Sequence, residues 1–133
     1  MVRPSNLDVL QHFQLQAPKT FSATGVSSTV DLHGLEGDLV VTVSATPIGS
    51  STAKMMLRLE QSETTKAEDF EEIFDMQNMV ESSLPDLLNE SYFRQVIVKT
   101  DAAMRYLRLN IYNVVGNPST VLCATAVAVK KNG

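Results

Sequence analysis

The chain has 133 residues, of which 44% are hydrophobic and 20% charged, with a formal net charge of −4. This length and composition are typical of one globular domain with its own core, and they exclude a chain that is disordered throughout. The negative charge disfavours a free-standing nucleic-acid-binding domain, because such domains carry an excess of Lys and Arg.

Signals for a membrane or an oxidising compartment are missing from the sequence. It contains no apolar run of the roughly 18 residues that a membrane-spanning helix needs, and its first residues lack the apolar segment of a secretory signal. We therefore expect no membrane contact and a protein made in a cytoplasm-like setting. The only cysteine, Cys123, cannot form an internal disulfide. Because it lies in an apolar stretch, we expect a buried small hydrophobe and not a reactive thiol.

An N-terminal arm is expected over residues 1–27, followed by a single domain over residues 28–133. The apolar residues of the arm are Leu7, Val9, Leu10, Phe13 and Leu15. Their spacing fits one face of a helix or one face of a strand, and Pro18 is expected to end either element. A small, polar stretch then separates them from the domain, so we expect the arm to bind a partner. The alternative is an edge strand packed on the arm's own domain.

Strands dominate the rest of the chain. Six are expected, over residues 28–32, 38–45, 54–60, 92–99, 105–115 and 120–129. Alternation is clearest in the second, where Leu39, Val41 and Val43 share one face. Residues 66–82 fit either a helix or one or two short strands. Strands separated by Gly, Pro, Asn and Ser predict an all-β protein, built as an antiparallel β-sandwich or barrel.

The last two strands are interpreted as neighbours that close the chain in one sheet through a tight turn at residues 116–119. Both are apolar on both faces over much of their length. Such strands lie centrally in a sheet or cover one face with a neighbouring subunit. We therefore expect self-association, and we assign the apolar surface to Leu107, Leu109 and Ile111.

No set of residues predicts catalysis or a cofactor. Of the two histidines, only His33 has a carboxylate on the same strand face, Asp31, and two ligands do not make a metal site. No serine lies in a G-x-S-x-G motif, and the carboxylates between residues 68 and 75 are interpreted as a solvated acidic face. We expect no enzyme activity, no metal, no cofactor, no small-molecule substrate and no nucleic acid.

Arginine and tyrosine side chains share one face of the strand over residues 105–115. On extended backbone, Tyr106 and Arg108 point the same way as Asn110 and Tyr112. Arginine on a sheet face can pair with a carboxylate or anchor an interface. A cross-strand pair with the acidic segment over residues 61–91 is at least as well supported as a binding role.

Several segments together resemble the capsid cement, or head decoration, proteins of tailed bacteriophages. The resemblance covers about residues 20–130 and rests on five stretches: S-S-T-V-D-L at 27–32, E-Q-S-E at 60–63, E-D-F-E-E-I at 68–73, R-Y-L-R-L at 105–109 and G-N-P-S at 116–119. It implies a jelly-roll-like β-sandwich on the outer surface of a virion. It also implies a homotrimer that clamps neighbouring capsomers and binds the major capsid protein.

Our expectation is therefore a structural virion protein, assembled in the host cytoplasm. Its interface with the capsid or within the trimer is assigned to seven residues: Leu7, Leu10, Phe13, Leu15, Tyr106, Arg108 and Tyr112. The alternative is a carbohydrate-binding or adhesive β-sandwich module. The complete lack of tryptophan weakens this alternative, because tryptophan is the side chain that most often stacks on sugars.

Overall fold

The computed structural model describes residues 10–73, 84–101 and 103–130, and regular structure in these ranges is almost entirely β. The elements are β1 (Leu10–Phe21), β2 (Gly25–Val26), β3 (Val30–Asp31), β4 (Leu35–Ala45), β5 (Lys54–Ser62), the 3₁₀ turn η1 (Ala67–Asp69), β6 (Glu71–Glu72), β7 (Tyr92–Lys99), β8 (Tyr106–Val115) and β9 (Thr120–Lys130). The six predicted strands are confirmed, the first only as the short β3. Between residues 66 and 73 the structure has η1 and β6, and the rest of the ambiguous stretch lies outside the described residues.

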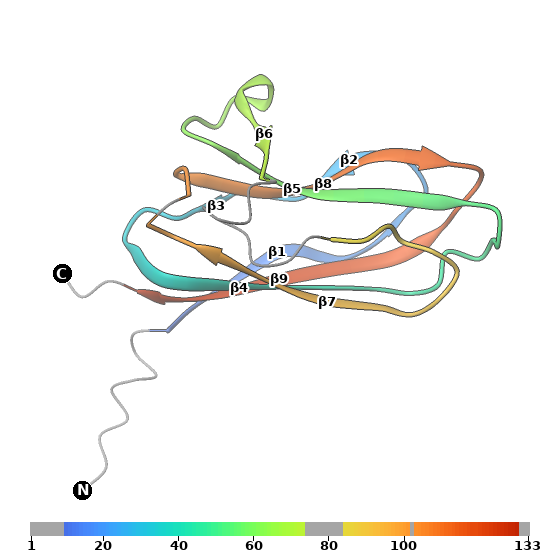
Figure 1. Cartoon of the computed structure of the whole chain (residues 1–133), viewed down its shortest axis with the longest axis horizontal. Helices are drawn as coiled ribbons and strands as arrows, with labels where there is room; N and C mark the ends of the chain where they lie inside the picture. Colours follow the sequence, from blue (N-terminus) through green and yellow to red (C-terminus); the bar gives the residue numbers. More distant parts are fainter. Residues whose placement is uncertain (1–9, 74–83, 102, 131–133) are drawn as a thin grey trace, which may run out of the picture.

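Two antiparallel sheets form the two layers of a sandwich (Figure 1). The first sheet has the strand order β1-β9-β4-β7. The second has the order β2-β8-β5-β6, with β3 also paired to β8. If β2 and β3 are taken as one interrupted strand, this arrangement is that of a jelly roll. The predicted all-β, jelly-roll-like sandwich is confirmed.

The core lies between the inward faces of the two sheets. The predicted alternation is confirmed in β4, where Leu39, Val41 and Val43 are completely buried. Other fully buried side chains come from β1, β5, β8 and β9, and they include Leu15, Met55, Leu107, Leu109, Ile111 and Leu122. Each long strand therefore contributes one apolar face to a single core, as expected for a domain of this size.

Residues 10–21 belong to the sheet and not to a separate arm. They form the edge strand β1, which pairs antiparallel with β9 from Leu10 to Phe21. Pro18 does not end the strand. It lies at a bulge, where the register shifts between Gln16 and Lys19. Proline is accepted there because its missing N–H leaves no hydrogen bond of the sheet unmade. The predicted boundary at residue 27 is therefore wrong, and residues 1–9 lie outside the described residues.

The last two strands lie in different sheets. β8 pairs with β5, whereas β9 pairs with β1 and β4. The expected hairpin is therefore wrong, and residues 116–119 cross from one layer to the other (Figure 1). Gly116 provides the positive φ of 77° that this crossing requires.

Cys123 lies on the outward face of β9 and is half-buried, so its expected full burial is wrong. The strand alternates, and the neighbouring Leu122 and Ala124 fill the core in its place. The Sγ atom of Cys123 lies 3.0 Å from the hydroxyl of Ser44 on β4.

Candidate functional site

Of the four interface residues predicted in the arm, the two whose side chains the structure describes, Phe13 and Leu15, pack on the chain's own domain. Leu15 is completely buried, and Phe13 is partly buried against the core. Leu10 begins β1, and Leu7 lies outside the described residues. The described part of the arm therefore faces its own domain, because a strand paired with β9 must place alternate side chains between the sheets.

The three interface residues predicted in β8 lie together on the outer face of the second sheet. Tyr106 and Arg108 are half-buried there, and Tyr112 is 40% exposed. The opposite face of β8 carries Leu107, Leu109 and Ile111, which are in the core. The sequence argument that those three residues offer an apolar surface for self-association is therefore wrong.

A buried carboxylate organises this outer face. Glu60 on β5 lies directly opposite Arg108 on β8 and is only 2% exposed. Its Oε1 accepts a hydrogen bond from Arg108 Nε at 2.8 Å. Its Oε2 accepts one from Arg58 Nε at 2.7 Å and one from Asn110 Nδ2 at 2.8 Å. Arg108 therefore forms a cross-strand ion pair, but with Glu60 on β5 and not with the acidic segment that follows this strand.

Each of the two guanidinium groups also lies over an aromatic ring. The Arg108 guanidinium carbon lies 4.0 Å from the ring centre of Phe70, and that of Arg58 lies 4.7 Å from the ring centre of Tyr112. Such cation–π contacts stabilise by roughly 0.5–2 kcal/mol each. Phe70 comes from the segment with η1 and β6, which stands on the outer side of the second sheet (Figure 1). We call Arg58, Glu60, Phe70, Arg108, Asn110 and Tyr112 the arginine cluster.

The arginine cluster keeps Glu60 ionised. Burial alone would raise the pKa of the Glu60 carboxyl, but hydrogen bonds from Asn110, Arg108 and Arg58 outweigh it and lower the pKa. These long side chains shield Glu60 from solvent, although Glu60 lies on the outer face of the sheet and not in the core between the sheets. The arrangement fixes two arginines at the surface and leaves no charge in it without a partner.

A second arginine–carboxylate pair lies directly before the first residue of β8. Arg105 Nε and Nη2 donate to the two oxygens of Asp31 at 3.0 and 2.9 Å. The hydrogen bond from Arg105 is the main cause that lowers the pKa of Asp31. Asp31 also accepts the backbone N–H of His33 at 2.9 Å. Its carboxylate is thus engaged, and no group of metal-binding side chains is found among the described residues.

Sequence reasoning missed Arg58, Glu60 and Phe70 as members of the site. Strand alternation over residues 54–60 puts Arg58 and Glu60 on one face of the strand, but it does not show which strand lies beside them. That pairing joins residues about 50 positions apart, for example Asn110 to Glu60 with a separation of 50. Long-range register of this kind is not encoded in local spacing.

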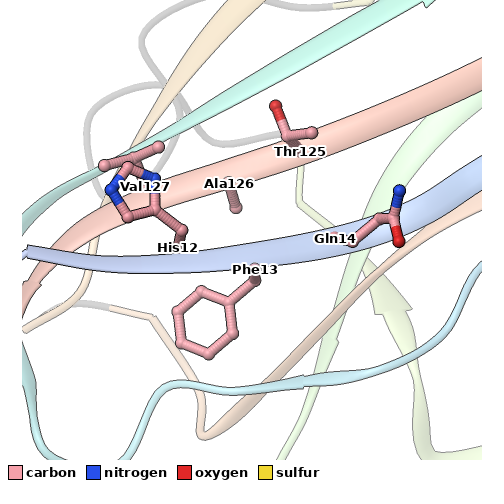
Figure 2. Close-up of a pocket in the computed structure, with 6 residues that line it drawn as sticks. All are labelled: His12, Phe13, Gln14, Thr125, Ala126 and Val127. Carbon is pink, nitrogen blue, oxygen red and sulfur yellow. The ribbon is translucent and has the colours of Figure 1, made fainter.

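A shallow hollow lies on the other sheet, between β1 and β9 (Figure 2). Its lining includes His12, Gln14, Thr125 and Val127. Phe13 points to the opposite side of β1 from His12 (Figure 2). His12 carries the only titratable group among these lining side chains.

No family model matches the chain, and no curated protein matches its sequence. Its structure is similar to the SPBc2 prophage-derived protein YomS, with 10% identity and a TM-score of 0.47 over 89% of this chain and 92% of that one. It is also similar to the K1 cleaved adhesin domain of Lys-gingipain from Porphyromonas gingivalis W83, with 11% identity and a TM-score of 0.45 over 93% and 99% of the two chains.

A third similar structure contains the CBM22-1 and GH10 modules of xylanase 10B from Clostridium thermocellum, complexed with xylohexaose. The identity is 11% and the TM-score 0.43, over 96% of this chain and 27% of that one. At these values none of the three similarities supports an argument about function. In the described residues, no helix is long and apolar enough to cross a membrane.

Proposed function

We propose that this chain is a non-enzymatic structural protein of a phage virion, which binds the outer surface of the capsid and clamps neighbouring capsomers. Its partner is the major capsid protein, and its contact surface is the arginine cluster on the outer face of β5 and β8. The protein is assembled in the host cytoplasm and stays on the virion.

One observation carries this proposal: four of the five segments that resemble capsid cement proteins converge on a single surface. Arg108 of the R-Y-L-R-L segment binds Glu60 of E-Q-S-E and stacks on Phe70 of E-D-F-E-E-I. Arg105 of the same segment binds Asp31 of S-S-T-V-D-L. Four stretches that lie far apart in the sequence therefore build one face of the folded chain.

The chemistry of this surface suits a protein partner. Arginine and tyrosine are enriched among the residues that dominate interface energies. Here they are already fixed by hydrogen bonds and ring contacts, so little side-chain freedom remains to be lost on binding. Many identical copies on one shell then strengthen a modest contact through avidity.

Co-sedimentation with capsids tests the proposal. Heads would be prepared from the phage or prophage that encodes this chain, with its gene deleted, and mixed with the purified protein. We expect saturable binding to the outer surface at a regular number of copies per head. Tyr112→Ala should weaken that binding about tenfold or more, which is about 1.4 kcal/mol, because Tyr112 is an exposed aromatic of the cluster.

Val121→Ala is the matched control, since Val121 is 43% exposed but lies on the outer face of the other sheet. It should leave capsid binding unchanged. Both variants should stay folded, and Tyr112→Ala should lose no more stability than the roughly 0.5–2 kcal/mol of its ring contact with Arg58. Failure of the parent protein to bind heads would refute the proposal. Binding to a glycan array in place of heads would favour the alternative of a carbohydrate-binding or adhesive module.

The homotrimer stays a prediction. Light scattering on protein released from heads measures it directly. The apolar face that first suggested it belongs to the core, so a trimer must use other residues.

A further inference from the structure

The two edges of the first sheet differ in how well they are protected against further pairing. The edge strand β1 contains two register shifts and Pro18, which interrupt its hydrogen-bonding edge. The other edge is β7, which pairs with β4 over eight consecutive residues without a shift. Bulges and prolines are two of the devices, besides charged side chains, that stop edge strands from pairing with another chain. β7 has neither of them, and among the described strands it pairs only with β4.

β7 also carries the most exposed large hydrophobic side chain of the described residues. Phe93 is 65% exposed on the outward face of the strand, and Ile97 lies half-buried on the same face. Leu88, which is 45% exposed, lines a groove beside the beginning of β7 together with Phe93. An apolar surface next to a strand edge that no described strand covers favours addition of a further strand.

We infer that β7 pairs antiparallel with β7 of a second copy of this chain, so that the two first sheets form one continuous sheet. With a twofold axis beside Gln95, Phe93 of each copy lies opposite Ile97 of the other, which gives two such pairs. Aromatic residues opposite β-branched residues stabilise antiparallel sheets. The same register matches outward faces to outward faces, which a shift by one residue would not do.

Self-complementarity is what selects a second copy as the partner. Between the two copies of β7 no like charges lie directly opposite each other, because Arg94 of one copy is opposite Val96 of the other and Lys99 is opposite Ser91. The two Arg94 side chains become diagonal neighbours, so salt should strengthen the contact by screening them. Gln95 keeps its hydrogen bond to Thr42 of its own sheet, at 3.4 Å.

Disulfide trapping tests this register on the purified protein, in a Cys123→Ser background and without capsids, so the result does not depend on the proposed function. Gln95→Cys places two thiols directly across the twofold axis, where opposite residues lie about 5 Å apart. Thr42→Cys is the control, because each thiol then lies one strand, about 4.8 Å, farther from the axis. We expect covalent dimers from Gln95→Cys under mild oxidation and none from Thr42→Cys.

Sedimentation velocity of the protein with its native cysteine tests the contact without a crosslink. We expect a concentration-dependent dimer, and Phe93→Glu should raise its dissociation constant at least tenfold. Val121→Glu should not raise it, because Val121 lies on the outward face of β9, an interior strand of the same sheet. A monomer at all concentrations, an oligomer that Phe93→Glu does not affect, or equal crosslinking of the two cysteine variants would overturn the inference.

Discussion

At the scale of single residues, Glu60 shows how this fold places a carboxylate under a surface. Local alternation predicts the side of the sheet on which Glu60 and Arg58 lie, and the structure agrees. It does not predict that Glu60 is buried, because its cover comes from Arg108 on another strand and from the segment with Phe70. A buried carboxylate is tolerated only when its oxygens receive hydrogen bonds, and here both oxygens do.

The charge of Glu60 should make the stability of the parent protein depend on pH, and removing the charge should abolish this dependence. Glu60→Gln takes the common partner from Arg58 and Arg108, and we expect a loss of about 1–3 kcal/mol at pH 7. The pKa of Glu60 is lowered on folding from its ordinary value of 4.5, so the unfolded chain binds the proton more readily. The stabilisation is therefore complete above about pH 4.5 and is lost as the pH falls through the lower native pKa.

Urea unfolding of both proteins between pH 3 and pH 7 measures this difference. Glu72→Gln is the control, because Glu72 also contacts Arg58, at 3.7 Å, but its side chain is 42% exposed. An exposed ion pair stabilises by less than about 1 kcal/mol. Equal effects of the two substitutions, or a difference for Glu60→Gln that does not change with pH, would contradict the assignment of Glu60 as the buried centre.

At the scale of elements, β1 shows why the sequence suggests an arm. Its apolar residues are interrupted by a proline and followed by a small, polar stretch, which is the usual signature of a linker. The interruption is real, but it is a bulge in an edge strand. The other long strands were predictable because their alternation and turn residues are local signals, whereas the partner of an edge strand is a long-range property.

Substitutions at two neighbouring positions test whether β1 is part of the folded core or an arm that does not contribute to stability. Leu15→Ala should destabilise the protein by about 2–5 kcal/mol, because Leu15 is completely buried between the sheets. Gln14→Ala, on the exposed face one residue earlier, should change stability by less than about 0.5 kcal/mol. Thermal unfolding of both variants decides the matter. An unchanged melting temperature for Leu15→Ala would show that β1 is not part of the cooperative unit.

At the scale of the whole molecule, the jelly roll follows from crossings between the sheets that the sequence does not reveal. Residues 46–53 connect β4 in the first sheet to β5 in the second, and residues 116–119 connect β8 back to β9. These two crossings meet at one end of the sandwich. The N–H of Ser119 donates to the carbonyl of Ile48 at 3.0 Å, and the N–H of Thr46 donates to that of Val121 at 3.1 Å. Turn residues at 116–119 predict a reversal of the chain, but a reversal within one sheet and a crossing between two sheets look alike locally.

Gly116 is the point at which the two crossings touch, and a pair of glycine substitutions isolates that contact. Gly49 and Gly116 both have positive φ, of 81° and 77°, so alanine strains the backbone at either position by about 1–2 kcal/mol. A Cβ at Gly116 would lie 3.0 Å from the Cβ of Ala53, whereas a Cβ at Gly49 would have no neighbour within 4 Å. Ala53 is buried directly before β5, and it has no flexible side chain that can move away. Gly116→Ala should therefore lower the stability by about 1–3 kcal/mol more than Gly49→Ala. Chemical unfolding of the two variants under identical conditions measures this difference. If both lose the same stability, the crossings do not pack on each other, and the closed end of the sandwich is held only by the hydrogen bonds between them.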